Sequence, residues 1–225
     1  MNLSRQELLL NPTQMANIKN ANILLIGVGG VGGAVAHMLV RAGVSNLTIM
    51  DFDKVSESNI NRQFVAYQST IGRYKVDVLT EQLKDINPDI NLTALNQKFD
   101  STNNIDLTAY TMIIDGIDDI KAKQYLISKC NELNLNLLCS MGAGNRYADN
   151  PHFEVVDIFK TQNDALAKLL RKYCKEQGIK HLKVCYTPSL AIKSSPVGSI
   201  SYYPTAMATT ITWYVINTLI EYLYK

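Results

Sequence analysis

The sequence predicts an α/β fold with a doubly wound, mostly parallel sheet, and two observations support this prediction. Short apolar runs of strand length alternate with longer segments of helical periodicity through most of the 225 residues. The apolar run 23–26 leads into a glycine-rich turn, 27–33, followed by a helical pattern up to Arg41 and a second apolar run, 47–50. Strand, glycine turn, helix and strand in this order form a βαβ unit, which requires parallel strands.

The remaining elements follow in the same alternation. Ahead of the glycine turn, an amphipathic segment, 5–18, is expected to be helical. After the second run we expect, in order, helix 74–86, strand 90–95, strand 111–114, helix 120–133, strand 135–139, strand 153–158, helix 164–176, strand 182–186 and a terminal helix, 205–223. Beyond Asn150-Pro151 the rhythm is less regular, so we expect this last third to be partly antiparallel. With no repeats or low-complexity tracts, residues 1–225 are expected to form a single domain.

Composition excludes several classes of protein. Hydrophobic residues make up 47% and charged residues 19%, which is typical of a compact globule and not of a disordered chain. The net charge of +2 is too small to indicate nucleic acid or membrane by itself. The four cysteines show no pairing pattern, no Cys-x-x-Cys pair that would suggest zinc, and no secretory signal ahead of them. We therefore expect reduced thiols and a cytoplasmic protein.

The terminal segment 205–223 is apolar enough to be mistaken for a membrane span. Threonine and asparagine side chains interrupt it, and Glu221 lies near its end. A spanning helix needs about 20 predominantly apolar residues. We expect a helix buried in the core or in a dimer interface, and no membrane partner.

The glycine turn is the first candidate binding site. Gly27, Gly29 and Gly32 form G-x-G-x-x-G between a strand and a helix, where glycines allow close backbone approach and the helix N-terminus attracts phosphate. Asp51 lies 19 residues beyond Gly32 at the end of the next strand, where a carboxylate can bind ribose hydroxyls. These features predict a Rossmann-like nucleotide site and, taken alone, favour a nicotinamide-dependent oxidoreductase.

Two cations after Asp51 change that balance. The polar loop 51–63 delivers Arg62, and Lys75 opens the next helix. Either residue alone could be a solvated surface charge. Together they favour a nucleotide triphosphate, because negative charge develops on pyrophosphate as it leaves.

A group of acids follows the fourth expected strand. The segment 115–119 reads Asp-Gly-Ile-Asp-Asp at the carboxyl end of that strand, where ligands of parallel sheets bind. Asp118 could hold Mg²⁺, which needs one or two carboxylates besides phosphate oxygens. It could equally cap the following helix. The sequence leaves both interpretations open.

Taken together, the segments 27–33, 51–63, 72–75 and 115–119 resemble, in order and spacing, the adenylating domain of the ThiF/MoeB/ubiquitin-activating superfamily. The resemblance implies ATP and Mg²⁺ as cofactors and acyl-adenylate formation as the reaction. It implies these site residues: Asp51 at the ribose with Asp53 beside it, Asn59, Arg62 and Lys75 at the phosphates, and Asp118 as the ligand of Mg·ATP. It also implies a homodimer in which Arg5 reaches the nucleotide of the partner subunit.

The C-terminal third narrows the resemblance. The segments 142–144, 149–151, 155–161 and 164–167 are similar to the tRNA threonylcarbamoyladenosine dehydratase group of that superfamily. This similarity implies that ATP activates the threonyl carboxylate of the modified adenosine in tRNA, which then closes a ring with loss of water. The chain departs from the group at Arg73, at Asn150 and in 186–189, outside the expected ATP site.

Other functions remain open at this stage. The main alternative is adenylation of the C-terminal carboxylate of a ubiquitin-like sulphur-carrier protein, with a carrier or sulphur-relay partner. A nicotinamide enzyme and a binding module without turnover are further alternatives. Cys185 lies in an apolar run and is interpreted as core, not as a thioester-forming residue.

Charge in the last third bears on the tRNA hypothesis. Residues 151–225 hold nine Lys and Arg against five Asp and Glu. Several of the cations cluster in 171–183, which suits a tRNA backbone, although a solvated helix face explains them equally well.

Overall fold

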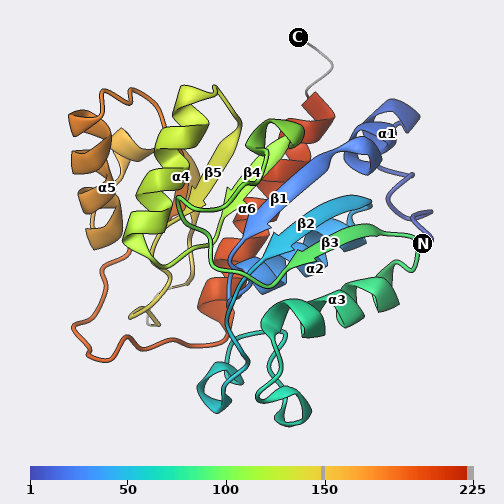
Figure 1. The fold of residues 1–225 in the computed structure, drawn as a ribbon, viewed down its shortest axis with the longest axis horizontal. Coiled ribbons are helices and arrows are strands. Elements are labelled where there is room, and N and C mark those ends of the chain that lie inside the picture. Colours follow the sequence, from blue (N-terminus) through green and yellow to red (C-terminus); the bar gives the residue numbers. More distant parts are fainter. Residues whose placement is uncertain (148–149, 222–225) are drawn as a thin grey trace.

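The computed structural model of the chain describes residues 1–147 and 150–221. Within them a single seven-stranded sheet runs in the order β3-β2-β1-β4-β5-β7-β6 (Figure 1). The strands are β1 (Asn22–Ile26), β2 (Asn46–Met50), β3 (Asn91–Leu95), β4 (Met112–Asp115), β5 (Leu137–Ser140), β6 (Glu154–Asp157) and β7 (Lys183–Tyr186). The α-helices are α1 (Pro12–Asn20), α2 (Gly32–Arg41), α3 (Lys75–Ile86), α4 (Ile120–Glu132), α5 (Ala165–Glu176) and α6 (Tyr202–Glu221).

The sheet is parallel except at one edge. β1 pairs in parallel with β2 and β4, and the parallel pairing continues through β5 to β7. β6 is antiparallel to β7, with Val155 opposite Cys185. The predicted Rossmann-like sheet with a partly antiparallel C-terminal third is therefore confirmed.

Alternating residues of the central strand fill two apolar layers. Ile23 and Leu25 of β1 lie in a cluster with buried residues of α1, α2, α3 and α6. Leu24 and Ile26 face the opposite cluster, which includes Leu126 of α4. Because both faces of β1 are covered, its sequence is continuously apolar and not alternating. Helices α4 and α5 lie together toward the end of the sheet that is farther from α3 (Figure 1).

The N-terminal helix begins later than the sequence predicts. The expected helix 5–18 is wrong at its start: residues 4–9 form turns, and α1 begins at Pro12. Asn11 accepts a hydrogen bond from the Gln14 amide, and the Gln14 side chain accepts one from the Asn11 amide. This capping box, with proline at the first helical position, sets the start because the residue before proline avoids helical geometry.

The terminal helix α6 packs against the body of the protein. Its residues Met207, Ile211 and Val215 are fully buried against α1, α2 and the sheet, whereas Trp213 is 59% exposed. Among the described residues, none of the helices combines the length and apolar character that a membrane crossing requires. Residues 222–223 of the predicted helix, and Asp149 of the C-terminal motif, lie outside the described residues.

Candidate nucleotide site

One cavity of about 450 Å³ opens at the carboxyl ends of β1, β2, β4 and β5. Loops from all four strands and the first turns of α2, α3 and α4 surround it. The predicted residues that line it are Gly27, Gly29, Gly32, Asp51, Asp53, Arg62, Lys75 and Asp118. The chain thus brings four separate sequence motifs to one edge of the sheet, where open α/β sheets bind ligands.

The glycine turn forms one wall of the cavity through close backbone contacts. Gly27 has φ +88°, and a Cβ atom there would lie 2.5 Å from the carbonyl oxygen of Gly116. A Cβ atom on Gly32 would lie 1.9 Å from the carbonyl oxygen of Gly27. Within the described part of the chain, the amides of residues 29–31 donate to no protein group. They are available to phosphate oxygens at the N-terminus of α2.

Asp51 is held rigidly at the end of β2. Its Oδ2 accepts the Val28 amide at 2.8 Å, and its Oδ1 accepts the Asp53 amide at 2.8 Å. Burial raises the pKa of Asp51 above the ordinary aspartate value, and these hydrogen bonds and the charge of Lys75 partly oppose that rise. The result is an oriented acceptor beside the glycine turn, as ribose binding requires.

The two predicted cations both reach this cavity, by different means. Lys75 is nearly buried, and its Nζ donates to Oδ2 of Asp53 at 2.8 Å. Arg62 is more open, and its Nη1 donates to the Ser58 carbonyl at 2.7 Å and to Oδ1 of Asn61 at 2.8 Å. Both side chains are therefore positioned before any ligand binds, which reduces the reorganisation needed to bind phosphate.

The structure separates the two roles that the sequence left open for Asp118. Asp119, not Asp118, caps α4: its Oδ1 accepts the amides of Lys121 and Ala122. Asp119 also pairs with Lys98 at 2.8 Å, which lowers the pKa of its carboxyl. Asp118 is exposed and lines the cavity. It thereby remains available to a ligand.

Sequence reasoning missed Lys123, which lies beneath the cavity. Its Nζ donates to Oδ2 of Asp115 at 2.7 Å and to the Ser140 carbonyl at 3.0 Å, and both charged side chains are fully buried. The available signal was position: Lys123 falls in the apolar stripe of α4 with Leu126 and Ile127. A lysine in such a stripe indicates a buried partner, because an unpaired buried charge is costly.

Gln63 and the segment after β3 are further residues that the sequence did not single out. Gln63 is 8% exposed and lines the cavity, and its Oε1 has no hydrogen-bond partner among the described residues. Buried polar atoms are usually paired, so this amide fits a polar ligand. Residues 97–99 close the cavity on the side of Asp51.

Two predicted site residues do not line the cavity. Asn59 is buried, and its Oδ1 accepts the Ser56 amide at 3.1 Å, which closes its own loop. Arg5 is exposed in the turns before α1, beside Gln6, whose side chain donates to the carbonyl of Ala42 after α2. Since α2 begins at the glycine turn and is about 15 Å long, Arg5 lies at the opposite edge of the sheet from the cavity of its own chain.

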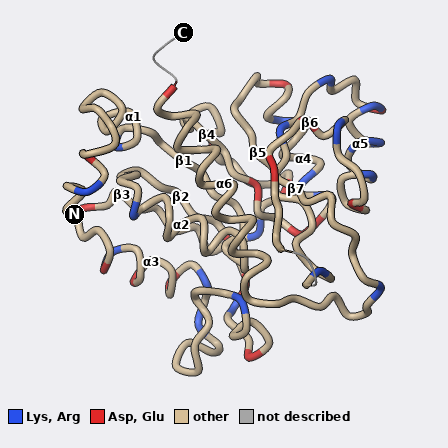
Figure 2. Tube along the Cα trace, turned by 180° about the vertical axis from the view of Figure 1, so that it is seen from behind, with Lys and Arg blue, Asp and Glu red and all other residues tan. Residues whose placement is uncertain are grey.

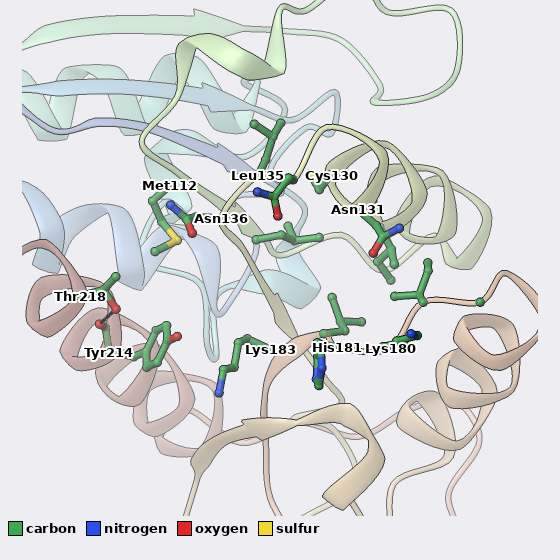
Figure 3. A pocket seen from close by; sticks show the side chains of 16 residues that line it. Met112, Cys130, Asn131, Leu135, Asn136, Lys180, His181, Lys183, Tyr214 and Thr218 are labelled. Atoms are coloured by element: carbon green, nitrogen blue, oxygen red, sulfur yellow. Dashed lines mark hydrogen bonds between the residues drawn. The ribbon is translucent and has the colours of Figure 1, made fainter. Parts of the chain in front are cut away.

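A second cavity of about 420 Å³ lies at the amino ends of β4, β5 and β7 (Figure 3). Its lining includes Lys180, His181, Lys183 and Tyr214 but none of the predicted site residues. Among the described residues that line it, none belongs to the first turn of a helix, and the cavity lies at the edge where parallel sheets rarely bind ligands. The first cavity therefore fits a nucleotide better than the second, and we call it the nucleotide cavity.

Comparison with known proteins agrees with this geometry. A model of the ThiF family matches residues 3–150, the part of the chain that holds every predicted site residue. The chain belongs to the ThiF family.

Curated relatives add detail within the ThiF family. The chain is 36% identical to tRNA threonylcarbamoyladenosine dehydratase of Bacillus subtilis over 179 residues, 79% of this chain and 70% of the relative. It is 34% identical to the Haemophilus influenzae enzyme of the same name, over 75% of this chain and 65% of the relative. The molybdopterin-synthase adenylyltransferase of Salmonella typhimurium is 34% identical over 54% of this chain and 49% of its own length. The dehydratases thus match a larger share of the chain.

Solved structures of similar proteins share the whole fold. The Escherichia coli dehydratase TcdA in complex with AMP has a TM-score of 0.92 at 24% identity, covering 99% of this chain and 95% of that one. The same enzyme in complex with ATP has a TM-score of 0.91 at 24% identity, covering 98% and 94%. The similarity extends through the C-terminal third, in which β6 and β7 complete the sheet.

Proposed function

We propose that this protein is an ATP-dependent tRNA threonylcarbamoyladenosine dehydratase, with residues 1–225 acting as a single adenylating domain in the cytoplasm. One observation carries the proposal: Arg62, Lys75 and Asp118 surround the same cavity as the glycine turn and Asp51. A dinucleotide site needs only the glycine turn and Asp51. Two cations and a further carboxylate suit a triphosphate whose pyrophosphate departs.

The residues fit Mg²⁺ carried by the nucleotide. Among the described residues there is no group of three or more His, Cys, Asp or Glu that could form a metal cage. Mg²⁺ needs only one or two carboxylates when phosphate oxygens complete its shell, and Asp118 is available in the cavity. Bound there, the ion would neutralise charge on the phosphates.

The chemistry requires positioning more than a covalent nucleophile. A carboxylate oxygen of the threonyl group attacks the α-phosphorus of ATP, and the bond to pyrophosphate breaks. A nitrogen of the same side chain then attacks the acyl carbon, its proton is lost, and AMP leaves with the former carboxylate oxygen. Holding both groups in one cavity supplies much of the rate enhancement. Arg62 and Lys75 stabilise the departing pyrophosphate, and Gly29 lets the phosphates approach the backbone.

Incubation with Mg·ATP and unfractionated tRNA tests this function, with AMP release and nucleoside mass spectrometry as readouts. Loss of water from the modified adenosine is expected. The variants Arg62→Ala and Lys75→Ala should each lower turnover about 100-fold or more, the scale of losing one preorganised electrostatic contact. Cys185→Ala should leave turnover nearly unchanged, because Cys185 is fully buried and burial raises the pKa of its thiol to about 12. AMP release with a carrier protein but not with tRNA would favour the carrier-protein alternative.

A homodimer with Arg5 acting on the partner's nucleotide completes the proposal. Arg5 is remote from the cavity of its own chain, and α6 leaves Trp213 largely exposed. Mixing Arg5→Ala and Lys75→Ala chains gives heterodimers in which one site has both residues intact. Activity should recover to about a quarter of wild type if subunits assort at random in a two-fold dimer. No recovery between two well-folded, dimeric variants would contradict action in trans.

A further inference from the structure

The outer face of α5 carries an unusual concentration of positive charge. Between residues 165 and 183 the chain has six Lys and Arg and a single acid, Glu176. Lys168, Lys172 and Lys175 are exposed and spaced by four and three residues, so they lie along one face of the helix. We call these three residues the basic stripe.

The inner face of α5 fixes the direction in which the stripe points. Ala167, Leu170 and Cys174 are fully buried in an apolar cluster with β7. Arg171 is half-buried, and its Nη1 donates to the Thr161 carbonyl at 2.8 Å. The helix is thus anchored on one side, and the basic stripe faces outward on a rigid element.

The N-terminal end of α5 lies at the nucleotide cavity, and the stripe runs along the helix away from that end. Leu166, in the first turn of α5, lines that cavity, and Gly178 and Ile179, just after the helix, line the second cavity. A helix of 12 residues spans about 18 Å. Lys and Arg positions recur along α5 (Figure 2), and Lys180 and Lys183 follow at the second cavity (Figure 3).

We propose that the basic stripe binds the phosphate backbone of the tRNA whose modified nucleotide enters the nucleotide cavity. This inference rests on the proposed function, and it locates a docking surface that the function itself does not specify. Phosphate contacts orient a nucleic acid without reading its sequence, which suits an enzyme that must present one nucleotide to a fixed cavity. The axial rise between successive stripe lysines is about 4.5 to 6 Å, so each can meet a different phosphate.

The stripe suits RNA better than an acidic protein. Protein interfaces usually have an apolar or aromatic centre. Among the large apolar side chains of α5, only Leu169 is exposed within the described residues, at 39%. Backbone recognition of RNA needs cations and no apolar centre.

A pair of double variants tests the proposal. Lys168→Gln with Lys175→Gln removes the two stripe lysines that form no ion pair within the described part of the chain, since Lys172 pairs with Glu176. The control, Lys19→Gln with Lys84→Gln, removes two exposed lysines of α1 and α3 that are likewise unpaired there. Both double variants lower the net charge by the same amount.

For the stripe variant we expect the Kd for tRNA to rise about 5- to 10-fold at physiological salt and the slope of log K against log salt to shrink by roughly 1.5 to 2. The KM for tRNA should rise with kcat unchanged, and the Kd for ATP should not change. The control should bind tRNA as wild type does.

A stripe variant that binds tRNA as tightly as the wild type would overturn the docking surface. An equal loss of tRNA affinity in the stripe variant and the control would overturn it as well. If the wild-type protein nevertheless releases AMP and dehydrates the modified adenosine, that result would not contradict the proposed function. A stripe variant that binds tRNA normally but loses affinity for an acidic carrier protein would overturn the choice of RNA. Absence of tRNA turnover in the wild type would instead remove the proposed function and this inference with it.

Discussion

Lys123 and Asp115 form a fully buried ion pair, 2.7 Å apart, directly beneath the nucleotide cavity. Oδ1 of Asp115 accepts the Ile117 amide at 2.9 Å, and Lys123 also donates to the Ser140 carbonyl. The pair therefore joins α4 to the ends of β4 and β5 and fixes the loop that presents Asp118. Replacing a buried ion pair as a whole often leaves the free energy of unfolding unchanged. We therefore expect the main role of this pair to be the positioning of the loop.

Removing one partner of this pair should be costly. Lys123→Met leaves the Asp115 carboxylate buried without its cation, and the free energy of unfolding should fall by about 3–5 kcal/mol. Urea denaturation followed by circular dichroism measures the loss. Adding Asp115→Asn removes the uncompensated charge and should restore at least half of the lost stability. A double variant as unstable as Lys123→Met alone would show that the charge is not the cause.

Two glycines of the turn should separate folding from binding. Gly32→Ala places a methyl group 1.9 Å from the Gly27 carbonyl, so the main chain must shift and stability should fall by about 3 kcal/mol or more. For Gly29→Ala the nearest atom is Nε2 of Gln63 at 3.9 Å, so the fold should be unaffected. Its methyl group faces the cavity, and ATP affinity should fall about tenfold because close phosphate approach is lost.

Thermal unfolding and calorimetry with ATP distinguish the two glycine variants. A Gly29→Ala protein that binds ATP as the wild type does would place the phosphates elsewhere. A Gly32→Ala protein with unchanged Tm would contradict the close contact between the start of α2 and the turn.

The architecture could be predicted from the sequence because it depends on local patterns. Apolar runs and turn signals are enough to predict a parallel sheet, since strands covered on both faces must be continuously apolar. The predicted start of α1 was wrong because the prediction gave more weight to the apolar periodicity of 5–18 than to the cap signal of Asn11-Pro12. In the protein the cap prevails.

Part of the site could also be predicted, because several of its residues depend on local sequence patterns. Residues such as Asp51 and Lys75 occupy recognisable places after a strand or at a helix start. Lys123 and Gln63 depend on packing between elements distant in sequence, which periodicity does not reveal. The choice between Asp118 and Asp119 as the cap depends on a single residue, and element boundaries are seldom predicted that finely.

His37 should make stability depend on pH. Its ring bonds to Gln82 at 3.0 Å and packs edge-on against Phe64. Burial, and to a lesser extent the charge of Arg41, lower the pKa of His37 below its ordinary value of 6.5. The unfolded chain therefore binds the proton more readily than the folded one. The stabilising contribution is fully present above the unfolded-state pKa of 6.5. It is lost as the pH falls through the lowered pKa of the folded state.

Scanning calorimetry between about pH 7.5 and pH 5.5 measures this effect. The Tm of the wild type should fall more steeply toward acid than that of His37→Gln, which retains a hydrogen-bonding side chain but cannot titrate. Parallel curves for the two proteins would assign the pH dependence to other groups.

Asp118 and Asp119 are adjacent carboxylates whose loss should have opposite consequences. Asp119→Ala removes the cap of α4, which should cost about 1 kcal/mol of stability. Its exposed ion pair with Lys98 adds little to that cost. Asp118→Ala removes an exposed side chain with no capping role, so Tm should not change.

Turnover should show the reverse order, because Asp118 is the carboxylate that we propose binds Mg·ATP. We expect Asp118→Ala to lower tRNA-dependent AMP release about 100-fold and to abolish the gain in ATP affinity that Mg²⁺ gives over EDTA. Asp119→Ala, assayed below its own Tm, should retain most of its activity and the full response to Mg²⁺. Equal losses of activity in the two variants would mean that the loop acts as a unit. Full activity in Asp118→Ala would assign the metal to another carboxylate that lines the cavity, such as Asp53, which would then exchange its partner Lys75 for the ion.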